Sequence, residues 1–176
     1  MIITRTFGTP LGNMIAGSVN DGLCLLEFTD RKMLGTEYKI LAKYTGEDIT
    51  EGSSPVIDQA ENELMEYFAG TRKSFMVPVK YTGTVFQMHV WDELLKIPYG
   101  TTRSYGRQAE ALGGSSSVRA VANANGMNKI EIIIPCHRVI GENGHLTGYG
   151  GGLWRKRWLI DHEKKHSGRP VDQTIF

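Results

Sequence analysis

The segment from Ile132 to Gly141 reads IIIPCHRVIG and places a cysteine directly before a histidine and an arginine. A thiol reacts as the thiolate, so a reactive cysteine needs a nearby group that takes its proton. His137 is adjacent to Cys136, but the apolar run before them predicts a strand, in which successive side chains point to opposite faces. A turn or a bridging water would then have to connect the two. Both a reactive thiol and a buried structural thiol are consistent with these residues.

A histidine that acts as a base needs a third group, which fixes its tautomer and stabilises its cation. The carboxylates in the same half of the chain include Glu163, Glu142 and Asp161, and the sequence by itself does not choose among them. A metal site is not indicated, because no second cysteine stands at CxxC spacing and the four later histidines form no convincing ligand set. Cys24, inside the apolar run LCLLEF, is interpreted as a buried structural thiol.

The composition is that of an ordinary soluble globular protein. The 176 residues are 40% hydrophobic and 22% charged, which suits one large domain or two small ones. The N-terminus does not read as a signal peptide, and no apolar run approaches the roughly 18 residues of a membrane-spanning helix. Two cysteines are too few for a disulfide framework. We therefore expect a cytoplasmic protein in a reducing compartment, or a nuclear one in a eukaryote, with no membrane partner.

Charge is distributed unevenly along the chain. Residues 1–100 hold nine Lys or Arg and thirteen Asp or Glu, a net charge of −4. Residues 101–176 hold eleven and six, a net charge of +5. A basic half suits a protein that presents one side to a polyanion, although ordinary scatter of surface charge also produces differences of this size.

Residues 1–82 are expected to form a small α/β domain. Residues 2–28 read as three short strands separated by TPLG and NDG turns. Ser54 and Pro55 supply an N-cap and a proline at the first position of a helix that ends before Gly70. The segment 72–83 is expected to be an edge strand followed by a linker.

Residues 83–170 are expected to form a mainly helical domain, followed by a tail at 171–176. A helix begins near Thr84, and a last amphipathic helix runs from about Leu153 to Lys165. Between them, RSYGRQAEALGG and SSSVRAVANANG read as two short helices joined by a turn. This is the pattern of a helix-turn-helix, although many paired helices never bind DNA.

These segments together resemble the O6-alkylguanine-DNA alkyltransferases, the methylated-DNA–protein-cysteine methyltransferases that repair O6-methylguanine. The string IPCHRV, from Ile134 to Val139, is similar to the alkyl-acceptor motif of that family. The resemblance spans nearly the whole chain in the expected order. It includes TPLG (9–12), LCLLEF (23–28), IPYGTTRSY (97–105), RAVANANGMN (119–128), LTGYGGGLWRK (146–156) and HE (162–163).

The resemblance implies a role for each matching residue. Cys136 would accept the alkyl group, and His137 would deprotonate it through a water. Glu163 would orient His137 and stabilise its charge. Asn128 would brace the turn that carries the cysteine, and Tyr105 would help to protonate the purine as the alkyl group leaves.

A second group of residues would handle the duplex and the extruded base. Arg119 would enter the duplex in place of the flipped nucleotide, with Ala120 next to it in the DNA-facing helix. The substrate pocket would be formed by Val139, Tyr149, Gly150 and Gly151. One departure from the family is Lys129, which stands where a proline is frequent.

The resemblance also implies the fold and the partner. The N-terminal part would be a ribonuclease-H-like α/β domain with an antiparallel sheet, and the C-terminal part a helical domain with a helix-turn-helix. A monomer without cofactor or metal would bind the minor groove of double-stranded DNA containing O6-alkylguanine, with O4-alkylthymine as an open second substrate. The alternatives are a non-catalytic alkyl-lesion-binding helix-turn-helix protein, a regulator with an incidental thiol, and a Cys-His-Glu hydrolase.

Overall fold

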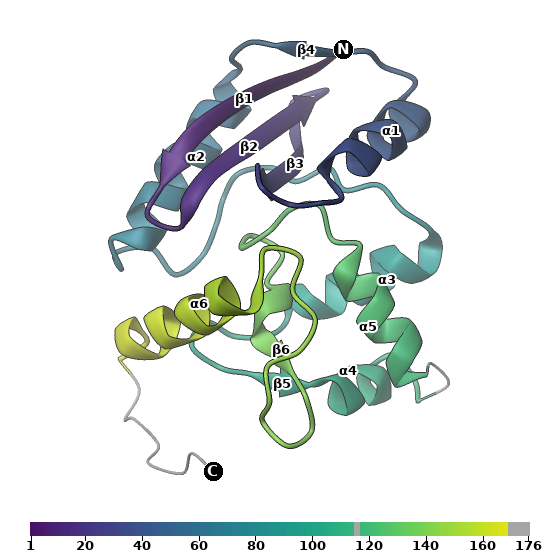
Figure 1. Ribbon diagram of the computed structural model, residues 1–176, viewed down its shortest axis with the longest axis vertical. Helices are drawn as coiled ribbons and strands as arrows, with labels where there is room; N and C mark the ends of the chain where they lie inside the picture. The colour runs from purple at the N-terminus through teal and green to yellow at the C-terminus, as the bar shows by residue number, and fades with distance from the viewer. Residues whose placement is uncertain (115–116, 169–176) are drawn as a thin grey trace. The chain divides into compact units, whose positions relative to one another are not determined.

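The computed structural model describes residues 1–114 and 117–168, which fold as two compact units (Figure 1). The first unit contains residues 1–84 and 129–133, and the second contains residues 85–128 and the chain from 134 onward. The sequence placed a single boundary near residue 82. It did not indicate the return of 129–133 to the first unit, because a long-range strand contact leaves no local pattern. The tail expected at 171–176 lies outside the described residues.

The first unit is built on a four-stranded sheet in the order β3-β2-β1-β4. Its first three strands form the predicted meander, with β1 antiparallel to β2 and β2 antiparallel to β3. The fourth strand pairs parallel to β1, so the sheet is mixed rather than wholly antiparallel. The strands are β1 (Ile2–Thr9), β2 (Gly12–Val19), β3 (Gly22–Phe28) and β4 (Ile49–Glu51).

Two helices complete the first unit, α1 (Leu34–Thr45) and α2 (Pro55–Phe68). Figure 1 shows α2 running along the sheet, and it contacts β1, β2 and β3. The predicted N-cap is confirmed, because Ser54 Oγ accepts a hydrogen bond from the backbone N–H of Ile57 at 3.2 Å. Cys24 lies in the apolar core that the strands form with α1, as expected for a structural thiol.

The edge strand predicted within 72–83 is wrong. The described backbone there makes one isolated parallel bridge, between Val79 and Leu23. Leu23 N donates to Pro78 O, and Lys80 N donates to Leu23 O. Pro78 has no N–H and so cannot extend the pairing into a ladder.

The second unit is mainly helical, and its helices are joined by buried polar contacts. Trp91 Nε1 donates to Ala124 O at 2.9 Å, which ties α3 to α5. Gln108 and Asn125 exchange two side-chain hydrogen bonds between α4 and α5. The elements are α3 (Val85–Leu95), β5 (Arg103–Ser104), α4 (Tyr105–Ala111), α5 (Val118–Gly126), the 3-10 turn η1 (Cys136–Arg138), β6 (Val139–Ile140) and α6 (Leu153–His166).

The two helices predicted from RSYGRQAEALGG and SSSVRAVANANG are therefore present as α4 and α5. Each begins at a serine cap: Ser104 Oγ accepts from Arg107 N, and Ser117 Oγ accepts from Ala120 N. The connection between them includes residues 115–116, which lie outside the described part of the chain. Within the described ranges, no helix has the length and apolar character needed to cross a bilayer.

Candidate active site

The backbone that leads to Cys136 is a series of tight turns, so the strand predicted for this run is wrong. After one bridge between Ile130 and Leu26, Ile133 N donates to Glu131 O, and Cys136 N donates to Ile134 O, each at 2.8 Å. These are three-residue turns. Pro135 cannot donate to a ladder, and Cys136 then begins the 3-10 turn η1. The strand argument that separated the two side chains therefore does not apply.

The thiol is held in a buried polar setting. Cys136 is 6% exposed, and Asn128 Nδ2 donates to its Sγ at 3.3 Å. The same amide nitrogen donates to Ile134 O at 2.9 Å, so Asn128 joins the end of α5 to the turn before the cysteine. An N–H donor at sulfur favours the charged form of the side chain, which is the nucleophilic one.

His137 faces Glu163, the first of the three carboxylates considered as its partner. Its Nε2 lies 2.7 Å from Glu163 Oε1, and both side chains are almost completely buried. Glu163 reaches this position from α6, where it also accepts from Gly100 N at 3.0 Å. The other two carboxylates lie elsewhere, since Asp161 is exposed and Glu142 accepts from Gly106 N near the start of α4.

Arg138 completes this cluster, and sequence reasoning missed it although it belongs to the PCHR string. Its Nε donates to Glu163 Oε2 at 2.8 Å, and its Nη2 donates to Oε1 at 3.0 Å. Its remaining terminal nitrogen, Nη1, donates to Ile97 O at 2.6 Å. A bidentate arginine fixes the plane of the carboxylate, and the carboxylate in turn fixes the imidazole.

The electrostatics of this cluster favour a neutral histidine beside an ionised glutamate. Burial lowers the pKa of His137, although the negative charge of Glu163 opposes this effect. Burial alone would raise the pKa of Glu163, but His137 and Arg138 together hold that pKa well below its usual range. His137 Nδ1 is buried and has no hydrogen-bond partner among the described residues, so it is the ring nitrogen that can accept a proton.

Tyr105 lies at the start of α4 and is 7% exposed. Its hydroxyl donates to Thr147 O at 3.1 Å, and Lys156 Nζ donates to the same carbonyl at 2.7 Å. Burial raises the pKa of Tyr105, and the charge of Cys136 adds to this effect. The phenol is therefore kept protonated. Lys156, in the LWRK string of α6, was not identified from the sequence.

The loop expected to line the substrate pocket lies directly before α6. Of Val139, Tyr149, Gly150 and Gly151, the first and last are buried, and Gly151 O accepts from Arg155 Nη1 at 2.8 Å. Left-handed backbone occurs at the loop's flanks, in Gly148 (φ 57°) and Gly152 (φ 95°). A Cβ added at Gly148 would lie 3.2 Å from the Tyr105 hydroxyl, so a larger residue there would crowd the phenol.

Arg119 and Ala120 are placed on the first turn of α5, not among the buried residues around the thiol. Arg119 is exposed, and Ala120 is half-buried. A guanidinium at this position can reach a partner outside the protein without first breaking a buried contact.

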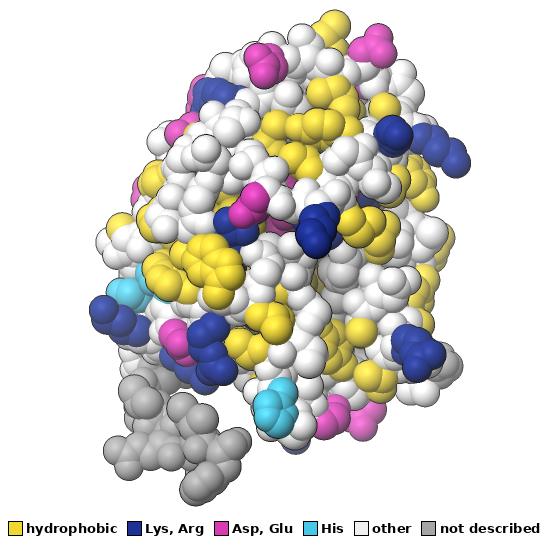
Figure 2. All heavy atoms as spheres, viewed as in Figure 1, with side chains coloured by type: hydrophobic (Ala, Val, Ile, Leu, Met, Phe, Trp, Pro, Cys, Tyr) yellow, Lys and Arg dark blue, Asp and Glu magenta, His cyan; other side chains and the backbone are white. Residues whose placement is uncertain are grey.

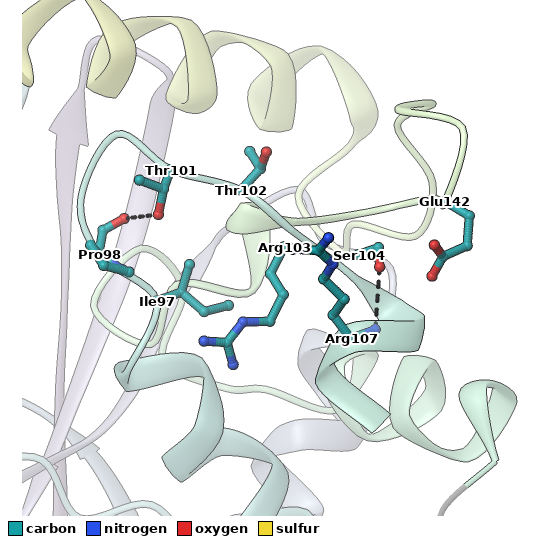
Figure 3. Close-up of a pocket in the computed structure, with 8 residues that line it drawn as sticks. All are labelled: Ile97, Pro98, Thr101, Thr102, Arg103, Ser104, Arg107 and Glu142. Carbon is teal, nitrogen blue, oxygen red and sulfur yellow. Dashed lines mark hydrogen bonds between the residues drawn. The ribbon is translucent and has the colours of Figure 1, made fainter. Parts of the chain in front are cut away.

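A separate polar cavity of about 420 Å³ lies at the junction of β5 and α4 (Figure 3). Within it, Ser104 Oγ accepts from Arg107 N, and Thr101 Oγ1 donates to Pro98 O. None of the four residues predicted for the substrate pocket lines it. The lining residues are Ile97, Pro98, Thr101, Thr102, Arg103, Ser104, Arg107 and Glu142.

Basic side chains gather on the outer side of α6. Figure 2 shows Lys and Arg side chains next to hydrophobic ones over this helix. Arg157, Lys164 and Lys165 are exposed there, and each belongs to the basic half of the sequence. The charge asymmetry read from the sequence thus corresponds at least in part to exposed residues of the unit that carries Cys136.

Known proteins match the chain over its whole length. The family model described as the DNA binding domain of 6-O-methylguanine DNA methyltransferase matches residues 85–165. A Mycobacterium tuberculosis protein named methylated-DNA–protein-cysteine methyltransferase is 43% identical over 176 residues, which is 100% of this chain and 99% of that protein. The constitutive Bacillus subtilis methyltransferase of the same name is 42% identical over 160 residues, which is 90% of this chain and 93% of that protein.

Solved structures agree with these sequence matches. The crystal structure of the M. tuberculosis O6-methylguanine methyltransferase has a TM-score of 0.80 at 40% identity, covering 99% of this chain and 98% of that one. A structure of the M. tuberculosis protein in complex with DNA also has a TM-score of 0.80, covering 97% of this chain and 96% of that one. The fold and the site thus define a cysteine-dependent methyltransferase class. The chain belongs to the O6-alkylguanine-DNA alkyltransferase family, the methylated-DNA–protein-cysteine methyltransferases.

Proposed function

We propose that the protein repairs DNA by moving the alkyl group of O6-alkylguanine to its own Cys136, once per molecule. The observation that carries this proposal is the buried arrangement of a thiol with an amide donor and a histidine paired to an ionised carboxylate. Asn128 Nδ2 lies 3.3 Å from the sulfur, and His137 Nε2 lies 2.7 Å from Glu163. Full-length similarity to methylated-DNA–protein-cysteine methyltransferases supports it.

The chemical step is a displacement at the alkyl carbon. The S–C bond forms while the bond from that carbon to guanine O6 breaks, and guanine leaves with the electron pair. The proton of the Cys136 thiol passes through a water to Nδ1 of His137. The leaving purine takes one proton from the Tyr105 hydroxyl, so it departs neutral. The thioether that forms is chemically stable, so the reaction stops after one turnover.

Each residue of the cluster then has a defined task. A neutral His137 can take the thiol proton, and Glu163 stabilises the imidazolium that results. Arg138 holds Glu163 ionised and in place, because it donates two hydrogen bonds to that carboxylate. Asn128 donates to the sulfur and so stabilises the thiolate as it forms.

An O6-alkyl group inside a duplex is out of reach of a buried thiol, so the nucleotide must be flipped out, at a cost of a few kcal/mol. We assign α4 and α5 to the helix-turn-helix that docks in the minor groove. The exposed Arg119 would enter the duplex beside Ala120 and occupy the space of the flipped base, which offsets part of that cost. Exposed basic residues of the same unit would contact phosphates without reading sequence.

The finer parts of the proposal follow the same chemistry. The base pocket would be formed by Val139, Tyr149, Gly150 and Gly151. The first unit would have a ribonuclease-H-like fold and the second a helical one, and the protein would act as a monomer. A reducing compartment would keep Cys136 as a free thiol. The DNA complex of the M. tuberculosis relative supports DNA as the partner. A non-catalytic lesion binder is not favoured, because such a protein has no use for a buried thiol that accepts from an amide and is followed in the chain by a histidine paired to a glutamate.

The test is transfer of label from a duplex that carries radiolabelled O6-methylguanine. The protein should gain label in proportion to its own amount and stop at one label per molecule. Cys136→Ala should gain none, while it still binds the duplex. Label transfer by Cys136→Ala, or continued loss of label from DNA beyond the amount of protein, would sink the proposal.

A further inference from the structure

Residues 129–133 lie between Asn128 and Ile134, two residues that form hydrogen bonds with Cys136. Asn128 precedes them and donates to both Ile134 O and Cys136 Sγ. Ile134 follows them and accepts from Cys136 N. These five residues nevertheless belong to the first unit. Because the chain is continuous, a segment that is held in place also limits the positions of Asn128 directly before it and Ile134 directly after it.

The backbone of this segment is pinned to β3. Leu26 N donates to Lys129 O, and Glu131 N donates to Leu26 O, each at 2.8 Å. Ile130 and Ile132 are fully buried. The segment therefore has little freedom to slide along the strand.

A buried ion cluster adds a second attachment. Arg31, 8% exposed, donates from Nη1 to Glu131 Oε1 at 3.1 Å and to Glu27. Its Nη2 lies 3.1 Å from Glu37 Oε1. Lys129, also buried, donates from Nζ to Thr82 O at 3.3 Å. One guanidinium thus joins carboxylates from β3, from α1 and from the segment 129–133.

Such a cluster is a poor way to gain stability. Buried ion pairs often contribute no more than well-packed hydrophobic residues of the same size, because the charges must be desolvated. What a forked guanidinium supplies is a defined position for each carboxylate that it contacts. Lys129 and Glu131 are the charged residues of an otherwise apolar segment. Their burial therefore costs desolvation free energy close to the turn that carries Cys136.

The segment also holds a strained backbone. Ile132 has φ of 70°, in the left-handed region that a β-branched residue avoids. The turn around it is closed by the Ile133 N to Glu131 O hydrogen bond. Strain of this kind persists only where the surrounding structure holds the residue on both sides. Glu131, whose carbonyl closes the turn and whose side chain contacts Arg31, is the residue that can do so.

We propose that Glu131 and Arg31 are positioning residues for alkyl transfer, since their ion pair fixes segment 129–133 and so the spacing between Asn128 and Cys136. The role of Glu131 and Arg31 in alkyl transfer rests on the proposed function. Their effect on the hydrogen bond between Asn128 and the Cys136 thiol does not depend on it. Without the ion pair, the turn at Ile132 relaxes, and the amide of Asn128 no longer meets the sulfur.

The test compares Glu131→Gln with Glu63→Gln. Glu63 is a matched control because it is also a buried glutamate of the first unit, and it accepts from Met76 N at 2.8 Å and Val77 N at 3.2 Å. Free O6-benzylguanine serves as the alkyl donor, so DNA binding does not enter the rate. Glu131→Gln should lower the single-turnover rate about tenfold, because small misplacements of reacting groups are costly. Glu63→Gln should keep the rate within about twofold of the wild type.

A second readout follows the thiol without any alkylated base. In a Cys24→Ser background, the rate of Cys136 with iodoacetamide is measured against pH. The loss of the amide donor should move the midpoint of that profile upward in Glu131→Gln and leave it in place in Glu63→Gln. This readout stays valid if the wild type transfers no alkyl group, which would defeat the proposed function alone.

The proposal is overturned if folded Glu131→Gln keeps the wild-type rate and the wild-type pH midpoint. Equal losses in Glu131→Gln and Glu63→Gln would overturn it too, since that result means general destabilisation. If Glu131→Gln does not fold, Arg31→Lys replaces it, because one ammonium cannot bridge three carboxylates in the same geometry. Arg5→Lys, at a guanidinium that contacts Asp58 and Glu61, is then the matched control.

Discussion

The two cysteines of this protein are both buried, yet their surroundings prepare them for different roles. Cys24 is 1% exposed and packs among Ile2, Ile15, Leu25 and other apolar residues. Its thiol donates to Gly17 O at 3.4 Å, and burial raises its pKa to about 11. Cys136 is 6% exposed, but it accepts a hydrogen bond from Asn128 and is followed by His137, whose ring is paired to Glu163.

The difference shows that two equally apolar-looking positions in the sequence can give a buried thiol opposite hydrogen-bonding environments. What differs is the direction of the hydrogen bond at sulfur: the Cys24 thiol donates to the carbonyl of Gly17, whereas the sulfur of Cys136 accepts a hydrogen bond from the amide of Asn128. The first arrangement stabilises the thiol and the second stabilises the thiolate.

The largest expected change in the reactivity of Cys136, relative to Cys24, follows from a substitution at Glu163. We expect Glu163→Gln to slow alkyl transfer from free O6-benzylguanine about 100-fold, because the imidazolium of His137 loses its counter-charge while the shape is kept. Single-turnover kinetics measure this. Asp161→Asn, an exposed carboxylate on the same helix, is the matched control and should react like the wild type. If the two variants react at the same rate, Glu163 has no part in the activation of Cys136.

A substitution at Arg119 distinguishes the access of a flipped base to the site from the chemical reactivity of Cys136. Arg119→Ala should slow repair of a duplex substrate about tenfold or more, because the gap left by the flipped base is unfilled. Its reaction with free O6-benzylguanine should be unchanged. Arg72→Ala, in the first unit, changes the charge equally and should affect neither substrate. Equal losses of Arg119→Ala on the duplex and on the free base would contradict the extrusion role.

The pH dependence follows from His137. Burial lowers its pKa, so the transfer rate should stay level through neutral pH and fall only below about 6.5, the ordinary histidine value. The unfolded chain binds more protons than the folded one at both His137 and Glu163, so stability should also decline with falling pH. The histidine contribution begins to be lost below about 6.5, and that of Glu163 below about 4.5, the ordinary values of the two side chains. A rate that already halves above pH 7 would contradict a buried neutral histidine.

Local signals account for most of what the sequence predicted correctly. The β1–β3 meander follows from short apolar runs between turns, and α2 follows from its serine cap and first-turn proline. Both strand errors occur at prolines, Pro78 and Pro135, whose missing N–H prevents a ladder. The spacing of apolar residues, from which the strands were predicted, does not reflect the missing backbone N–H of proline.

The candidate site was predictable only in part, because its partners are distant in the sequence. Asn128 and His137 lie close to Cys136 along the chain, whereas Glu163 arrives on α6 and could not be distinguished from Asp161 or Glu142 by residue type. The family resemblance selected it, and the 2.7 Å contact with His137 is consistent with that choice. The contacts of Arg138, Lys156 and Glu131 depend on tertiary packing that no local pattern reveals.

The smallest effect is expected at Cys24. Cys24→Ala removes a buried sulfur and should lower the free energy of unfolding by about 1–2 kcal/mol, measured by urea denaturation. Its single-turnover transfer rate should stay within about twofold of the wild type. A strong loss of transfer in a folded Cys24→Ala protein would mean that the two thiols are not independent.

The most direct test of the account is the location of the transferred group. The protein is incubated with a slight excess of duplex containing O6-methylguanine, digested, and mapped by mass spectrometry. We predict one methyl group on the peptide that contains Cys136, none on the peptide that contains Cys24, and unmodified guanine in the DNA. A methyl group on any other residue, or repair of more lesions than there are protein molecules, would contradict it.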